Sequence, residues 1–136
     1  MSLIFGLVLS LGMEKPKVLI ADDNHLTKEM YSAALQQADF IVFTARDGRE
    51  AVGLALQHKP DVILMDIRMP EFDGHQAAKK IREDIWGRTA KILFLTNQSD
   101  MDSIADAVSV GGLEYIIKAN TDVSRVVNTV REYACA

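Results

Sequence analysis

The sequence predicts an α/β fold: a doubly wound, five-stranded parallel sheet with helices on both faces. Short apolar runs, rich in β-branched residues, alternate with segments of helical spacing, and this pattern occurs five times. Three of the runs are almost continuously apolar, as is typical of parallel strands covered on both faces. The length of 136 residues suits one domain. Strands that alternate with helices in this way argue for a doubly wound sheet.

Each element follows from the apolar pattern and its punctuation. The expected strands are residues 18–21, 40–44, 62–66, 92–95 and 114–117, and the expected helices are residues 25–38, 48–58, 75–86, 100–110 and 122–133. Asp47, followed three residues later by Glu50, predicts a capped start for the second helix. The third helix is expected to place Ile81 and Ile85 on its inner stripe and to end at Trp86.

Composition limits the classes of function. Apolar residues make up 49% and charged residues 25% of the chain, which indicates a globular protein. The net charge is -4 and no basic cluster is present, so we expect no direct nucleic-acid binding. The single cysteine, Cys135, cannot form an internal disulfide, which suits a reducing, cytoplasmic location. His25 and His75 are expected at the surface.

Residues 1–13 do not match the rest of the chain. Their apolar stretch is shorter than the roughly 20 residues that span a bilayer, so no membrane association is expected. Lys15 follows this stretch instead of preceding it, which argues against a signal peptide. We expect a vector-derived or mis-assigned start with Met13 as the natural initiator, and residues 14–136 as the domain; a docking segment is the alternative. If ordered, the apolar segment should pack on this domain or on a neighbouring chain.

Acidic side chains follow two of the predicted strands. Asp22 and Asp23 come directly after the first strand, and Asp66 ends the third. Ligands of doubly wound sheets bind at the carboxyl ends of the strands. Magnesium takes oxygen ligands and uses only one or two carboxylates. We expect Asp23 and Asp66 each to supply an oxygen, the backbone carbonyl of Arg68 to supply another, and Asp22 to hold a metal-bound water.

Two further strand ends carry polar groups. Thr96 follows the fourth apolar run and Lys118 follows the fifth. An ammonium can pair with a phosphoryl oxygen as a point charge, and a hydroxyl can donate to another oxygen. Each residue alone has a plainer interpretation, such as a helix cap for the acids, a β-favouring residue for Thr96 or a solvated side chain for Lys118. Their occurrence together favours a site that holds a phosphoryl group on an aspartate.

In this order and spacing, Asp22-Asp23, Asp66, Thr96 and Lys118 resemble the receiver domain of two-component response regulators, which has a flavodoxin-like fold. The stretch from Leu64 to Pro70, with Gly74 beyond it, resembles a receiver signature, and the resemblance covers about residues 14–134.

The resemblance implies that Asp66 accepts a phosphoryl group, with Mg²⁺, from a histidine kinase or phosphotransfer protein. It implies that Thr96 and Lys118 sense the phosphoryl group and that Tyr115 is the aromatic that turns inward. The fourth helix, last strand and fifth helix would then form the surface for an effector domain, a downstream protein or a homodimer. Such a domain is a signalling component and not an enzyme.

Other interpretations remain open. A receiver-like docking module that is never phosphorylated is the alternative. A dehalogenase-like phosphatase would need a second aspartate where Arg68 stands. The protein is either a single-domain relay or part of a longer regulator, and we favour the second.

Two positions depart from the receiver pattern. Ala119 replaces the proline that usually follows the lysine, so we expect a trans Lys118–Ala119 bond. Asn97 replaces a small residue after Thr96, which predicts slow hydrolysis of the aspartyl phosphate and a shorter lifetime in Asn97→Ala.

Overall fold

The sheet has the predicted doubly wound topology. A computed structural model describes residues 15–97, 110–118 and 121–135, and in this part of the chain five parallel strands form one sheet in the order β2-β1-β3-β4-β5. The strands are β1 (Lys17–Ala21), β2 (Ile41–Ala45), β3 (Val62–Asp66), β4 (Ile92–Thr96) and β5 (Glu114–Ile117). The strand order reverses next to β1, so the carboxyl ends of β1 and β3 meet where such sheets bind ligands.

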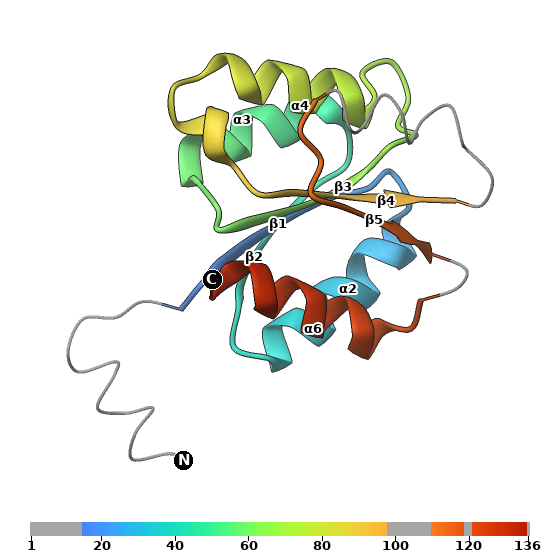
Figure 1. The fold of residues 1–136 in the computed structure, drawn as a ribbon. Coiled ribbons are helices and arrows are strands. Elements are labelled where there is room, and N and C mark those ends of the chain that lie inside the picture. The colour runs from blue at the N-terminus through green and yellow to red at the C-terminus, as the bar shows by residue number, and fades with distance from the viewer. Residues whose placement is uncertain (1–14, 98–109, 119–120, 136) are drawn as a thin grey trace.

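Helices cover both faces of the sheet. Figure 1 shows α3 (Gly48–His58) and α4 (Gly74–Glu83) on one face, and α2 (His25–Gln37) and α6 (Val123–Ala134) on the other. A short 3₁₀ helix, η1 (Trp86–Thr89), follows α4. The predicted helix 100–110 lies outside the described residues except for Val110, which is in a turn, and the apolar segment 1–13 also lies outside them.

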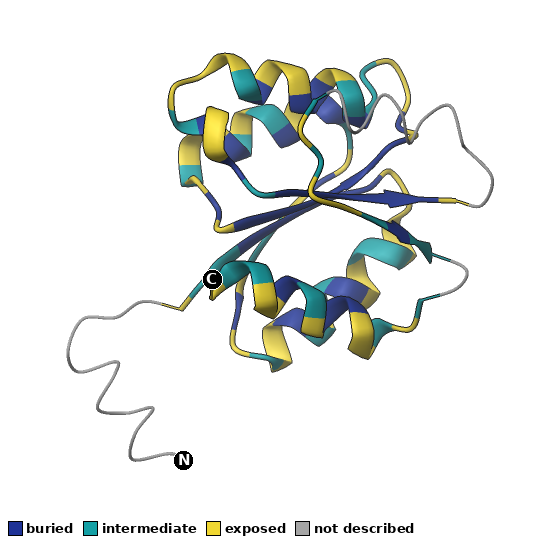
Figure 2. Ribbon diagram, in the orientation of Figure 1, coloured by how far each residue is buried: buried dark blue, intermediate teal, exposed yellow. Residues whose placement is uncertain are grey.

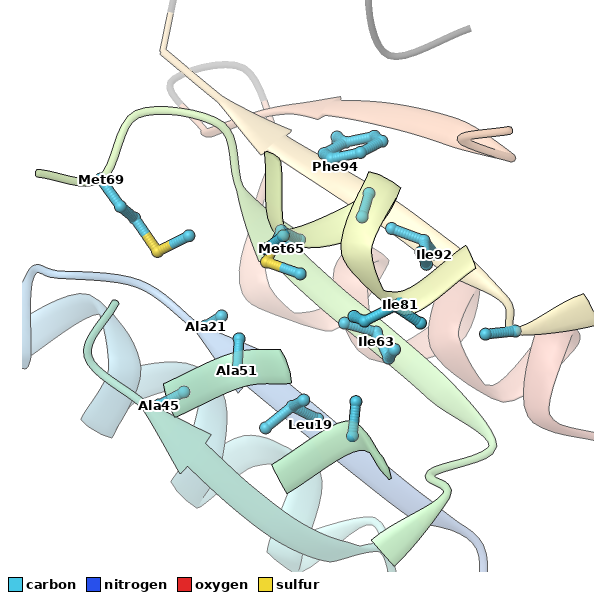
Figure 3. Close-up of a cluster of buried hydrophobic side chains, with 14 of the residues drawn as sticks. Leu19, Ala21, Ala45, Ala51, Ile63, Met65, Met69, Ile81, Ile92 and Phe94 are labelled. Atoms are coloured by element: carbon cyan, nitrogen blue, oxygen red, sulfur yellow. The ribbon is translucent and has the colours of Figure 1, made fainter. Parts of the chain in front are cut away.

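Two apolar cores explain the continuous apolar runs. In β1, Leu19 packs in the cluster under α3 and α4, whereas Val18 and Ile20 pack in the cluster over α2 and α6. Every residue of β3 and β4 is buried, and Figure 2 shows these central strands in dark blue. Figure 3 shows the first cluster, in which Phe94 of β4 and Met65 of β3 lie between the sheet and α4.

Side-chain caps fix where the helices begin. The four capping residues, each accepting a hydrogen bond from the backbone N–H three residues on, are Asn24, Asp47, Asp73 and Asp122. Asp47 caps α3 as predicted, although Glu50 accepts from the N–H of Arg46 and not from that of Asp47. The complete capping box is instead at Asp73 and Gln76, and it starts α4 one residue before the predicted position.

The predicted end of the third helix, expected over residues 75–86 and observed as α4, was wrong. α4 stops at Glu83 because the backbone of Asp84 is extended. Ile85 is therefore 80% exposed and not part of the inner stripe, and Trp86 lies in η1.

Arg82 explains why the chain turns at this point. Its guanidinium donates to the carbonyl oxygens of Gly87 at 2.7 Å and Ala90 at 2.5 Å, which folds the chain back against α4. It also donates to the carbonyl oxygens of Val110 at 3.2 Å and Gly111 at 2.9 Å. Helical periodicity carries no signal for such long-range hydrogen bonds, so the sequence pattern continued the helix too far.

Gly74 lets α4 approach the end of β3, and its replacement tests this contact. A Cβ at Gly74 would lie 2.2 Å from the backbone oxygen of Asp66. Gly74→Ala should lower the free energy of unfolding by roughly 2–4 kcal/mol, measured by urea denaturation. Gly53 of α3 has open space around the same position, so Gly53→Ala should raise the stability by about 0.5–1 kcal/mol. Equal effects of the two variants would contradict the close approach.

Candidate functional site

Three carboxylates meet at the carboxyl edge of the sheet. Asp66 is the last residue of β3, and Asp22 and Asp23 follow the end of β1 directly. Ala21 pairs with Met65 in the parallel ladder, which brings the residues that follow them to the same level. One oxygen from each of the three acids lies within 4.8 Å of the others. Asp22 and Asp66 are buried, whereas Asp23 is exposed, so the cluster has one side open to solvent.

Lys118 supplies the positive charge of the site. Its ammonium lies 2.8 Å from Oδ2 of Asp22 and 3.2 Å from Oδ2 of Asp66. Lys118 follows β5, which is separated from β3 by β4, so a long side chain is needed to reach the acids. The other oxygen of Asp22 accepts from the backbone N–H of Asn24 at 2.9 Å. Asp22 is thereby fixed between the lysine and the start of α2.

Burial and the negative charge of Asp22 disfavour ionisation of Asp66, the candidate phosphoacceptor. Desolvation, followed by the charge of Asp22, raises the pKa of Asp66 to about 7, although Lys118 acts in the opposite direction. Burial alone would lower the pKa of Lys118. Its hydrogen bond to Asp22 and the charges of both acids outweigh burial, so the pKa of Lys118 is raised and the ammonium stays protonated. The site therefore has more negative than positive charge when all of its groups are ionised.

Thr96 is the last residue of β4, which lies between β3 and β5 in the sheet, and its side chain is buried. Its relative exposure is 3%, and its hydroxyl donates to the backbone oxygen of Asn97 at 2.8 Å. The expected hydrogen bond from Thr96 to a phosphoryl oxygen remains a prediction. Asn97 is exposed, so its proposed effect on hydrolysis also remains a prediction. Ala119 lies outside the described residues.

An open cavity lies beside the exposed acid. It has a volume of about 460 Å³ and is lined by residues that include Asp23, Arg68 and His75. Asp73 and His75, at the start of α4, form part of its wall. The N–H of Gly74 donates to the oxygen of Ile67 at 2.9 Å, which holds this end of α4 against the segment that follows β3. Arg68 is exposed, and the role of its carbonyl as a metal ligand remains a prediction.

The acidic cluster fits a small divalent cation. All of its donors are carboxylate oxygens, which Mg²⁺ prefers, and their spacing allows them to converge on one ion. Asp23 and Asp66 are placed to offer an oxygen, whereas Asp22 already accepts two hydrogen bonds. The expected assignment of Asp22 to an indirect role remains a prediction.

Two residues near the site were not identified from the sequence. His75, expected at the surface, is half-buried, and its Nε2 atom is fully enclosed. Tyr31 of α2 is buried, and burial, together with the charges of Asp22 and Asp66, raises the pKa of its phenol. The position of His75 at the start of a helix did not indicate that its Nε2 atom is enclosed. The position of Tyr31 within a helix did not indicate that it lies near the acids.

Comparison with known proteins identifies the family. Residues 18–131 match the model of the response regulator receiver domain, so the chain belongs to the receiver domain family. Members of this family are signalling proteins of two-component systems and not classical enzymes. The predicted fold class and family are therefore confirmed.

Three relatives illustrate the match. The chain is 40% identical over 75% of its length to the transcriptional regulatory protein PdtaR of Mycobacterium tuberculosis, of which it covers 49%. It is 30% identical over 85% of its length to the polar-differentiation response regulator DivK of Brucella anthropi, of which it covers 94%. The receiver domain of a Pseudomonas aeruginosa sensor histidine kinase, with magnesium coordinated in its active-site cleft, superposes with a TM-score of 0.82 at 25% identity, covering 90% of this chain and 99% of that one.

The extent of the match differs between relatives. The chain spans less than half the length of PdtaR, whereas it spans almost all of DivK. None of the helices in the described part of the chain is long and apolar enough to cross a membrane.

The repulsion among the acids predicts that Asp66→Asn stabilises the metal-free protein. A raised pKa means that Asp66 contributes stability at low pH that is lost as the pH rises through about 7. In a chelator at about pH 8, the variant should gain roughly 1–3 kcal/mol in the free energy of unfolding, measured by urea denaturation. This advantage should shrink as the pH falls towards about 4.

Asp39→Asn is the matched control, because it removes one exposed acidic charge far from the cluster. It should change the stability little at any of these pH values. An equal gain in both variants would attribute the effect to net charge and not to the site.

Proposed function

We propose that this receiver domain accepts a phosphoryl group on Asp66, in a Mg²⁺-dependent reaction, from a histidine kinase or a phosphotransfer protein. The observation that carries the proposal is the pairing of one partly buried ammonium, that of Lys118, with the buried carboxylates of Asp22 and Asp66. A structural ion pair needs only one acid. A third acid, Asp23, stands at the open side, where an incoming group would arrive.

The geometry supports a simple displacement. A carboxylate oxygen of Asp66 attacks the phosphorus of a phosphohistidine, a P–O bond forms and the P–N bond breaks, and the leaving imidazole takes up a proton. Lys118 then holds an oxygen of the bound phosphoryl group as a point charge. Bound Mg²⁺ would supply charge neutralisation, with Asp23 and Asp66 as its carboxylate ligands. Thr96 can donate its hydroxyl to a second phosphoryl oxygen once it leaves the carbonyl of Asn97.

The output follows from the position of the sensing residues. Thr96 ends β4 and Lys118 follows β5, so a phosphoryl group that attracts both would shift the segment from the end of β4 through β5 to α6. Tyr115 lies in this segment. We propose that the surface of this segment engages an effector domain, a downstream protein or a second copy of the chain, in the cytoplasm.

The alternative, a docking module that is not phosphorylated, is less well supported. Such a module would not need the clustered acids or the lysine, yet the acids lie together and the lysine contacts two of them. Nucleic-acid binding by this domain is not proposed, because the net charge is -4.

Phosphorylation can be tested directly by mass. Incubation with Mg²⁺ and a small phosphodonor, such as acetyl phosphate, should add one phosphoryl group to the intact protein. Asp66→Asn should abolish the gain, and a chelator should prevent it. Lys118→Ala should still be modified but should lose the downstream change in β5, because the ammonium reports the phosphoryl group. A gain that persists in Asp66→Asn would place the modification elsewhere, and the absence of any gain with donor or kinase would favour the docking module.

The surface beside the acids suggests where the phosphodonor protein docks. Leu26 is 76% exposed and Met30 is 47% exposed on α2, which begins next to Asp23. They line an open groove of about 840 Å³ along this helix. The donor must bring its phosphohistidine to the acids and would therefore cover the exposed side chains of Leu26 and Met30.

Leu26→Lys separates docking from chemistry. It should slow phosphoryl transfer from the cognate kinase by roughly tenfold or more, while transfer from acetyl phosphate stays unchanged. Ile85→Lys is the matched control, since Ile85 is 80% exposed but lies beyond the far end of α4. A uniform loss with both donors would indicate damage to the site, and an equal effect of the control would contradict docking on α2.

A further inference from the structure

His75 carries a buried polar atom that the phosphoryl chemistry does not use. Its Nε2 atom is enclosed and has no hydrogen-bond partner in the described part of the chain. Enclosed polar atoms are normally paired, because an unpaired one loses its bonds to water without replacement. A second conformation that pairs this atom would remove the deficit.

The surroundings of His75 point to one candidate partner. The imidazole packs against the ring of Phe94, with the ring centroids 5.5 Å apart. Phe94 of β4 is directly paired with Tyr115 of β5, and paired residues of neighbouring parallel strands point to the same face of the sheet. Tyr115 is half-buried and packs against the same core cluster as Phe94. His75 and Tyr115 thus both contact the cluster that contains Phe94, directly below the end of β4.

Thr96 connects this cluster to the site. It follows Phe94 by two residues in β4 and therefore lies on the same face, one step nearer the acids. Movement of Thr96 towards a phosphoryl group on Asp66 would leave space at the end of the cluster. The phenol of Tyr115 carries a polar end that needs a hydrogen-bond partner when it becomes buried.

We propose that His75 is a positioning residue of the switch, whose Nε2 atom forms a hydrogen bond with the hydroxyl of Tyr115 when that ring turns inward. This rests on the proposed function, because the inward position requires the phosphorylated state. A neutral imidazole has one donor and one acceptor, and a phenol can take either part, so the pair is compatible with both tautomers. The bond would stabilise the inward state only, which is the differential contact that a population shift requires.

The test is nuclear magnetic resonance of the imidazole nitrogens in the full chain, with and without Mg²⁺ and beryllium fluoride as a phosphoryl mimic. The Nε2 resonance of His75 should move to the position of a hydrogen-bonded nitrogen on addition of the mimic, and Tyr115→Phe should abolish this movement. His58 is an internal control, because it stacks on Phe43 of β2, which lies at the opposite edge of the sheet from β5, and it should not respond. His75→Gln assigns the resonance.

Variants at His75 give a second measurement. His75→Leu keeps an apolar side chain against Phe94 but removes the polar atom. In the presence of the mimic, it should shift the population of Tyr115 towards the outward position by about fivefold, the factor expected for one hydrogen bond. His75→Gln retains a donor and an acceptor and should restore part of the inward population. A variant that fails to fold is recognised by its spectrum and does not affect the measurement on the unaltered chain.

The outcomes separate this inference from the proposed function. Modification of Asp66 with an unchanged His75 resonance would overturn the role of His75 and leave the phosphoryl switch intact. A movement of the resonance that persists in Tyr115→Phe would also overturn it, because the partner would be another group. No modification of Asp66 by any donor would overturn both proposals.

Discussion

The arrangement of the site depends on the ion pairing of Lys118 with Asp22 and Asp66. These three side chains come from segments that follow or end β5, β1 and β3, and they meet at one edge of the sheet. Buried acids at this separation repel one another, and without the ammonium their ionisation would cost several kcal/mol. The lysine offsets part of this cost, yet the pKa of Asp66 still lies near 7. The site is consequently one that a divalent cation or a bound phosphoryl group can change strongly.

The sheet topology is what makes this pairing possible. With the order β2-β1-β3-β4-β5, the two acidic strand ends are neighbours and the lysine approaches across β4. The same strand order places Thr96, at the end of β4, between Asp66 at the end of β3 and Lys118 after β5. The apolar cores on the two faces are nearly continuous through β3 and β4, so these strands form a rigid base for the site. The groups proposed to respond to phosphorylation end β4 and follow β5, whereas the proposed acceptor is at the end of the buried β3.

Most of the fold and the principal site residues could be predicted from local pattern. β3 was predicted with its observed bounds because its residues form a continuous apolar run that ends in Asp66, and α3 because Asp47 is a capping residue at its start. α4 was predicted too long because the hydrogen bonds of Arg82 to distant carbonyls override helical periodicity. His75 was misassigned because burial of a side chain at a helix start depends on what packs over it. The three acids and Lys118 were expected to meet because parallel strands bring their carboxyl ends to one edge of the sheet, and these four side chains do lie together.

The polar contacts in this structure also constrain the energetics of switching. The hydroxyl of Thr96 is already bonded to the oxygen of Asn97, and the ammonium of Lys118 already contacts both buried acids. A phosphoryl group must therefore replace existing interactions instead of filling empty ones, so only the difference between old and new contacts shifts the population. Lys118 can keep its contact with Asp22 while it exchanges its contact with Asp66 for one with a phosphoryl oxygen, so this exchange costs little free energy. Thr96 must give up its hydrogen bond to the oxygen of Asn97 and reorient. In the proposed switch, the rearrangement of β4 and β5 therefore depends mainly on the threonine and on whatever stabilises the aromatic ring that replaces it.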